Sequence, residues 1–147
     1  MAEVWGPGSG RPLPRLLASL ACEDAAASQG VADGRVTLQR VFFDLYAARF
    51  PAGFDRMTVV NFWSGGEGTV RAAVRLVAPD GAEVARGETE LACVDAPGTA
   101  VQVVYFPGLV LPGPGRYTVE VLLDGAAVHA YELHVVGPSE EVEDGQG

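Results

Sequence analysis

The residues best suited to chemistry are two histidines, and their spacing does not favour a joint site. His129 and His134 are five positions apart, which places two side chains on opposite faces of a regular strand. A zinc site needs three or four converging ligands, so a β-bulge would have to lie between these histidines before they could share one. We therefore expect solvent-facing histidines and no metal or other cofactor.

The two cysteines, Cys22 and Cys93, are the next candidates, and they lie far apart in the sequence. They could bridge two sheets in an oxidising compartment, whereas in a reducing one each would be a small buried apolar group. Glu23 and Asp24 follow Cys22 directly, and neighbouring carboxylates raise the pKa of a thiol instead of activating it. We expect buried cysteines without a disulfide and no thiol catalysis.

A glycine-rich stretch covers residues 63–68. A phosphate-binding loop of this kind runs from a strand into a helix and carries a Lys or Ser/Thr after its glycines. Here the stretch joins two predicted strands and lacks those residues, so we expect a hairpin loop. Glu83, Glu88 and Glu90 lie on one predicted strand, where Glu83 faces opposite to the other two unless a bulge intervenes, and we expect exposed strand residues. The sequence therefore assigns no catalytic residue.

Aromatic side chains are concentrated between residues 42 and 63. Most of them should be core, but Phe42 and Phe43 are adjacent, as are Phe62 and Trp63, and adjacent strand residues point to opposite faces. One ring of each pair could thus lie outside the core, and exposed aromatic clusters mark interfaces. We predict a possible interface that includes Phe42, Phe62 and Trp63.

The elements that must position these residues are strands. The chain has 19 Gly and 10 Pro in 147 residues, which leaves little room for long helices. Residues 69–77 alternate apolar and polar side chains, and Pro79-Asp80-Gly81 supplies a turn. Further strands are expected over residues 16–22, 36–41, 43–50, 57–63, 82–94 and 99–106.

A second hairpin closes the sequence. Residues 117–123 alternate, and Asp124-Gly125 is typical of a two-residue turn. That turn would direct Val128 inward, but the later apolar residues have the opposite parity, so we predict a bulge within residues 129–132. Tyr117 follows a Pro/Gly-rich corner, and we expect its hydroxyl to bond to upstream backbone as in a tyrosine corner.

Strands with one apolar face need a second layer, and no amphipathic helix is available to supply it. The sequence therefore predicts an all-β fold, an immunoglobulin-like antiparallel β-sandwich of about eight or nine strands, with a closed barrel as the alternative. We expect a flexible Gly/Pro leader over residues 1–13, a sandwich domain over residues 14–136 and a disordered acidic tail over residues 137–147.

The charge and hydropathy of the chain limit its possible partners and its cellular location. A net charge of -9 and a pI near 4.5 disfavour nucleic acid as a partner, and no apolar run is long enough to span a membrane as a helix. Residues 11–22 imitate a lipoprotein signal ending at Cys22, but the apolar stretch is too short and contains prolines. We expect a cytoplasmic protein.

Several segments follow one another in an order that indicates a protein family. They are residues 20–27, Asp33-Gly34, the pair Phe42-Phe43, Arg49-Phe50-Pro51 and the closing hairpin at residues 115–125. This order, over roughly residues 14–136, resembles a family of small bacterial proteins classed as a domain of unknown function. The resemblance implies an immunoglobulin-like sandwich and brings no activity, substrate or catalytic residue.

The functional hypothesis from the sequence is a non-catalytic binding or protein-interaction module, with an unknown protein partner or a second copy in a homodimer. An exported or surface-associated structural domain is one alternative. An enzyme with a carboxylate or histidine site on a loop is the other.

Overall fold

The computed structural model describes residues 12–27 and 35–138, and every element in this part is a strand. This confirms the all-β class, with ten strands where the sequence predicted eight or nine. Among the described residues no helix is long and apolar enough to cross a membrane. The strands are β1 (Arg15–Cys22), β2 (Asp24–Ala27), β3 (Val36–Gln39), β4 (Asp44–Tyr46), β5 (Ala52–Phe54), β6 (Thr58–Val77), β7 (Glu83–Tyr105), β8 (Leu109–Leu111), β9 (Gly115–Leu123) and β10 (Ala126–Val136).

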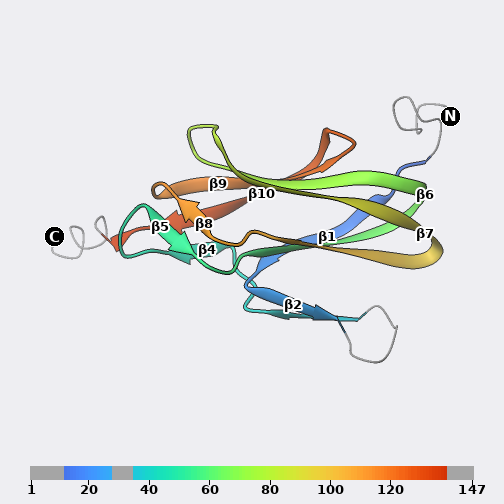
Figure 1. Ribbon diagram of the computed structural model, residues 1–147, viewed down its shortest axis with the longest axis horizontal. Helices are drawn as coiled ribbons and strands as arrows, with labels where there is room; N and C mark the ends of the chain where they lie inside the picture. Colours follow the sequence, from blue (N-terminus) through green and yellow to red (C-terminus); the bar gives the residue numbers. More distant parts are fainter. Residues whose placement is uncertain (1–11, 28–34, 139–147) are drawn as a thin grey trace.

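One long hairpin, β6 with β7, forms the frame of the molecule. Its ladder begins beside the turn, where Val77 pairs with Glu83, and ends where Thr58 pairs with Tyr105. Both strands bend together halfway along, at the end of the molecule shown on the right of Figure 1. The expected hairpin loop at residues 63–68 is therefore wrong, because the chain bends there and continues as the same strand.

Glycines make this bend possible. Gly65, Gly66 and Gly68 have φ angles of 73°, 89° and 71°, a region that side chains with a Cβ rarely adopt. A Cβ on Gly66 would also lie 2.8 Å from the sulfur of Cys93. The ladder is interrupted after Gly65 and resumes where Thr69 pairs with Ala92.

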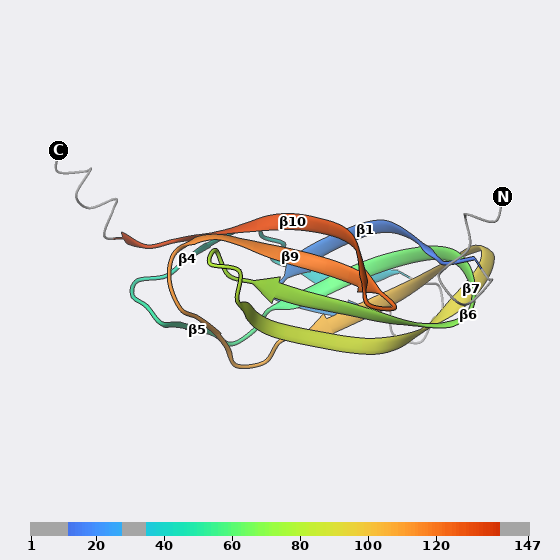
Figure 2. The same ribbon diagram turned by 90° about the horizontal axis from the view of Figure 1, so that it is seen from above.

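The bend divides the main sheet, whose order is β1-β6-β9-β10-β4 with β7 on the other side of β6. β1 pairs with the first half of β6, and β9 pairs with the second half. The sheet therefore curls, with β1 in one half and β9, β10 and β4 in the other (Figure 2). Two small antiparallel pairs, β2–β3 and β5–β8, complete the structure.

Strand β4 is much shorter than the predicted strand over residues 43–50. It pairs with β10 in parallel over three residues only, from Asp44 opposite His134 to Tyr46 opposite Val136. The amide of Ala47 adds one more bond to Val136. A strand of this length is typical of a protected sheet edge.

The core lies between the two halves of the curled sheet and has two parts. The large cluster joins Val59 and Val104 of one half to Leu76, Val119 and Leu133 of the other. The small cluster lies nearer the bend and consists of Trp63, Val70, Ala72, Leu91, Val121 and Leu123. The halves approach closely, because a Cβ on Gly87 would collide with Val104 across the core.

Buried amides lie at the boundary between these clusters. Gln102 accepts hydrogen bonds from the Asn61 amide at 3.0 Å and from the Trp63 indole at 3.1 Å. Its own amide donates to the carbonyl of Ala72 and to the hydroxyl of Thr89, both at 3.1 Å. One side chain thus ties both halves of the bent hairpin together, because Ala72 and Thr89 lie beyond the bend from Gln102.

The closing hairpin forms as predicted at its turn but not beyond it. Asp124 and Gly125 have φ angles of 47° and 87°, as a tight two-residue turn requires, and Leu123 pairs with Ala126. The register then shifts between Ala127 and His129, so the bulge falls at Val128 and not within residues 129–132. The slip directly after the turn directs Val128 outward, which corrects the expectation that it faces the core.

Candidate functional site

The strands β1 and β10 lie side by side without forming a ladder with each other in the described part of the chain (Figure 2). β1 pairs with β6 only, and β10 pairs with β9 and, at its end, with β4. The two strands touch through side chains, since the hydroxyls of Ser19 and Tyr131 lie 3.0 Å apart. Beyond this contact, toward the bend, a groove opens between them.

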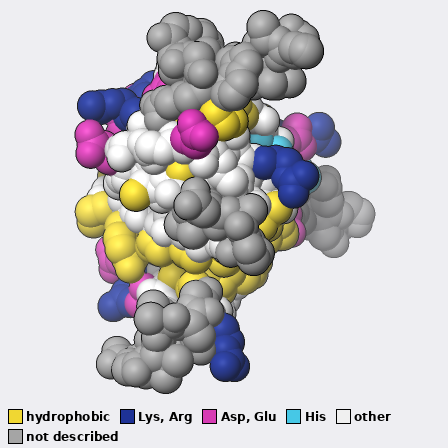
Figure 3. All heavy atoms as spheres, turned by 90° about the vertical axis from the view of Figure 1, so that its right-hand side faces the viewer, with side chains coloured by type: hydrophobic (Ala, Val, Ile, Leu, Met, Phe, Trp, Pro, Cys, Tyr) yellow, Lys and Arg dark blue, Asp and Glu magenta, His cyan; other side chains and the backbone are white. Residues whose placement is uncertain are grey.

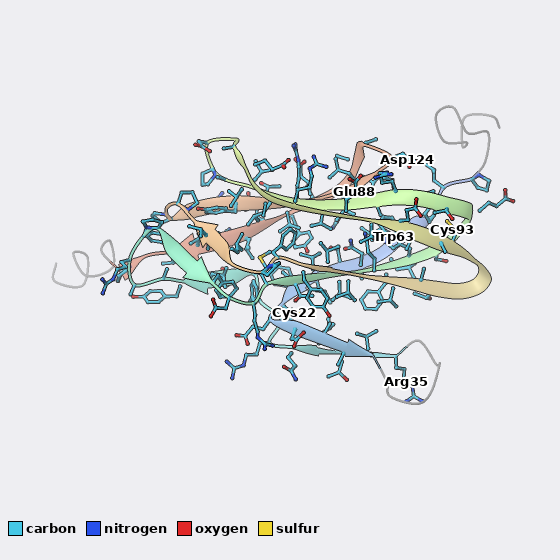
Figure 4. The ribbon with its side chains drawn as sticks, in the orientation of Figure 1. Cys22, Arg35, Trp63, Glu88, Cys93 and Asp124 are labelled. Atoms are coloured by element: carbon cyan, nitrogen blue, oxygen red, sulfur yellow. The ribbon has the colours of Figure 1, made fainter. Side chains whose placement is uncertain are left out.

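The groove has an apolar base and a volume of about 550 Å³. Leu16, Trp63 and Leu123 line it, and all three belong to the small core cluster or pack against it. In Figure 4, Trp63 lies between the two halves of the bent hairpin. A hollow of this size is within the range of ordinary ligand sites.

A bulge on each strand supplies an aliphatic side chain at the groove. The β1–β6 register shifts between Leu16 and Ala18, which leaves Leu17 as the extra residue, and Val128 is the extra residue of β10. Leu17 is 49% exposed and Val128 is 46% exposed, and both line the groove. Bulges at sheet edges redirect side chains, and here each turns an apolar one toward solvent. Figure 3 looks onto the bend of the β6–β7 hairpin and shows apolar side chains mainly in the lower half of this end, with charged side chains toward the margins.

Aromatic rings continue the β10 side of the groove. The rings of His129 and Tyr131 are 5.6 Å apart, and Phe43 meets Tyr131 edge-on at 6.1 Å. Burial raises the pKa of Tyr131 to about 12, so its phenol stays protonated over the ordinary pH range. The phenol can therefore donate or accept one neutral hydrogen bond but carries no charge.

The three residues predicted as an interface lie in different surroundings. Trp63 is only 1% exposed, so its ring contributes to the base of the groove and not to an outer face. Phe62 is half-buried, and Phe42 packs edge-on against Phe54 beside the large cluster. The more exposed ring of the first pair is Phe43, at 45%. The structure does not bring Phe42 together with Phe62 and Trp63, because the first packs on the large cluster and Trp63 belongs to the small one.

The residues predicted to be structural lie in β9 and in the turn that follows it. The Tyr117 hydroxyl donates to the carbonyl of Gly113 at 2.6 Å, which is the upstream backbone bond of a tyrosine corner. Asp124 and Gly125 form the β9–β10 turn, and Asp124 also accepts from the amide of Arg71 at 3.1 Å. Asp124 thereby fixes the turn to β6.

The histidines do not converge, because the bulge precedes His129 instead of separating the two. His129 lines the groove, whereas His134 lies 3.3 Å from Glu132 and 3.5 Å from Asp44. Within residues 12–27 and 35–138, no group of three or more His, Cys, Asp or Glu side chains has the geometry of a metal site.

The cysteines lie well apart along the molecule (Figure 4), and the described residues contain no disulfide between them. Burial raises the pKa of the Cys22 thiol, and the Asp24 carboxylate raises it further. A protonated thiol is a poor nucleophile.

A smaller hollow of about 240 Å³ has three acidic residues in its lining, Glu23, Asp24 and Asp55, beside the apolar residues Met57 and Phe106. Asp24 uses one oxygen to accept from the amide of Ala25 at 2.8 Å and the other to pair with Arg56 at 2.9 Å. Its carboxylate is therefore already engaged within the protein.

Sequence reasoning missed the groove residues Arg15, Leu17 and Val128. The parity conflict in β10 signalled a bulge but not its place. In β1 the inward residues Leu16 and Ser19 are three positions apart, and this broken alternation was the available signal.

The comparison with protein families adds one match. A model described as a family of unknown function (DUF6941) matches residues 17–136, from the bulge of β1 to the end of β10. No curated protein matches the chain. The match covers most of the chain, so this chain belongs to the family of unknown function DUF6941.

Proposed function

We propose that this chain is a non-catalytic protein-interaction module that binds a segment of a partner protein in the groove between β1 and β10. The observation that carries the proposal is the pair of half-exposed aliphatic side chains, Leu17 and Val128, above an apolar base. Leaving such side chains in water is unfavourable by about 25 cal/mol per Å² of apolar surface. A partner that covers them recovers this free energy.

The scaffold proposed for this module is an immunoglobulin-like β-sandwich. Three observations support it: the core between the two halves of the sheet, the bond from Tyr117 to Gly113, and the antiparallel pairing of β1, β6, β7 and β9. In such a scaffold β1 and β10 are natural places for recognition. In the described structure β1 has a side without a ladder partner, and so does β10 ahead of His134, where its pairing with β4 begins.

The groove is preferred over the acidic hollow for two reasons. The groove is larger than the hollow, and the carboxylate of Asp24 in the hollow already holds the amide of Ala25 and the guanidinium of Arg56. Carboxylates engaged in this way are less available for acid–base chemistry with a substrate.

A peptide selection tests the proposal. Random peptides displayed on phage are selected against the native protein and against three variants: Leu17→Asp, Val128→Asp and Val110→Asp. Val110 is the matched control, because it is 52% exposed and does not line the groove. We expect enrichment with the native protein and with Val110→Asp, and its loss with the two groove variants. Equal enrichment across all four proteins would overturn the proposal.

A second copy of the chain is the other occupant that the sequence suggested. Size-exclusion chromatography with light scattering distinguishes the two cases. A mass near 15.3 kDa leaves the groove open for another protein. Twice that mass, lost in Leu17→Asp but kept in Val110→Asp, would make the groove a homodimer interface.

A further inference from the structure

The groove differs in charge from the rest of this acidic protein. The chain carries a net charge of -9, yet none of the described residues that line the groove is Asp or Glu. The described lining has two titratable side chains, Arg15 and His129. A site without acids in a strongly acidic protein favours partners that carry negative charge.

Arg15 has no ion pair with any described residue. Most other arginines in the described structure are paired with acids, as Arg56 is with Asp24 and Arg75 is with Glu120. Arg15 lies at the start of β1, beside the apolar base formed by Leu16 and Trp63. Its guanidinium is therefore free to donate two parallel hydrogen bonds to a carboxylate, which is the planar geometry that arginine favours.

The bulges indicate how a partner would be recognised. A bulge distorts the edge of its strand, so a regular ladder along β1 or β10 is disfavoured at Leu17 and Val128. Recognition then depends on side chains more than on added main-chain bonds. The groove presents Leu17 and Val128 for an apolar contact above a base that includes Trp63, and it presents Arg15 for a charged contact.

From these observations, and resting on the proposed function, we infer that the groove binds a protein segment in which an apolar side chain is flanked by carboxylates. The apolar side chain covers Leu17 and Val128. A neighbouring carboxylate pairs with Arg15. The net charge of -9 repels acidic segments in general, and this repulsion is weaker at the groove because its described lining carries Arg15 and no carboxylate.

Peptide titrations followed by amide NMR test this inference. The probes are three blocked pentapeptides with a central leucine, flanked by glutamates, by glutamines or by lysines. We expect the glutamate peptide to bind about two- to fivefold more tightly than the glutamine peptide at low ionic strength, with the gap closing as salt is added. The amides of Leu17, Val128 and His129 should shift most.

Variants separate the charged contact from the apolar one. Arg15→Gln should remove the preference for glutamate over glutamine, whereas Arg116→Gln, an exposed arginine on β9, should leave it unchanged. Leu17→Ser should weaken all three peptides alike. Since Arg15, Arg116 and Leu17 are exposed, these variants should fold.

The results that would reject the acidic partner differ from the results that would reject the proposed interaction module. Equal binding of the glutamate and lysine peptides, with Leu17→Ser weakening both, rejects the acidic partner and leaves the interaction groove standing. Shifts confined to residues outside the groove, unaffected by Leu17→Ser, reject both.

Discussion

The large and the small core clusters are formed by the same long strands, but they are enclosed differently. The large cluster is covered at its end by Leu109 and Leu111 of β8 and by the bond from Tyr117 to Gly113. The small cluster reaches the surface, because Trp63 and Leu123 form the base of the groove. The two clusters thus differ in the surface feature they border: Trp63 and Leu123 of the small cluster face the groove between β1 and β10, whereas Met57 and Phe106 of the large cluster face the smaller hollow.

The largest effect should come from the large cluster. Leu133 is fully buried in the large cluster, so Leu133→Ala should lower the free energy of unfolding by about 2–5 kcal/mol. Urea denaturation followed by circular dichroism measures the loss. A change below that of the exposed control Leu17→Ala would show that the large cluster is not the main source of stability.

The second largest loss in the free energy of unfolding should come from the hydrogen-bond network at the boundary between the clusters. Gln102→Leu leaves the amide of Asn61, the indole of Trp63 and the carbonyl of Ala72 without their partner. Each buried unpaired group costs about 1–3 kcal/mol, and relaxation recovers part of it, so we expect a net loss of about 2–3 kcal/mol. Denaturation followed by Trp fluorescence reports it. Adding Asn61→Leu should recover some of the loss, and a further equal loss would contradict a shared network.

The corner that closes the large cluster should contribute less. Tyr117→Phe keeps the ring in the core and removes both hydrogen bonds between its hydroxyl and Gly113, so the expected loss is about 1 kcal/mol. Thermal unfolding measures it against Tyr46→Phe, a change at a residue that is 63% exposed. Equal melting temperatures for the two variants would exclude a stabilising corner.

Tyr131 packs against the large cluster, and it predicts a pH dependence. Its pKa is raised from 10.0 to about 12 by burial, so the protonated form is favoured in the folded state. Its contribution to stability is therefore complete below pH 10 and is lost as the pH rises toward 12. Absorbance of tyrosinate during alkaline titration should show a late step that Tyr131→Phe removes. A spectrum without that step would contradict burial of the phenol.

The smallest effect on stability should come from the groove. Leu17→Ser should change the free energy of unfolding by no more than about 0.5 kcal/mol, because the side chain is half-exposed. If the same variant abolishes peptide binding, stability and recognition are separated between the two clusters. A loss of several kcal/mol would instead make Leu17 a core residue.

Local patterns in the sequence predicted local features of the fold. Alternation over residues 69–77 and 117–123 identified parts of β6 and β9, and Asp124-Gly125 identified the turn that joins β9 to β10. These features depend on the pleat and on the φ angles of neighbouring residues, which the sequence states directly.

The features that sequence could not predict depend on contacts between distant residues. Gly65, Gly66 and Gly68 permit either a loop or a bend, and the pairing of both halves of β6 with β7 selects the bend. The groove requires β1 to lie beside β10, and those strands are more than a hundred residues apart in the chain, as Ser19 and Tyr131 show. The buried pairing of Asn61 with Gln102 likewise has no local signature.

The bend in the β6–β7 hairpin also has a consequence for the order of folding. The turn at Pro79-Asp80-Gly81 closes a short loop, and each further pair along the ladder adds little to the entropy cost of closure. A single zippering event from this turn can therefore lay down strands of both halves of the sheet. Two sheets usually come together through slow formation of contacts between residues far apart in the sequence. Here the ladder of one hairpin can extend from its turn and bend at its glycines, so that the same hairpin contributes strands to both halves.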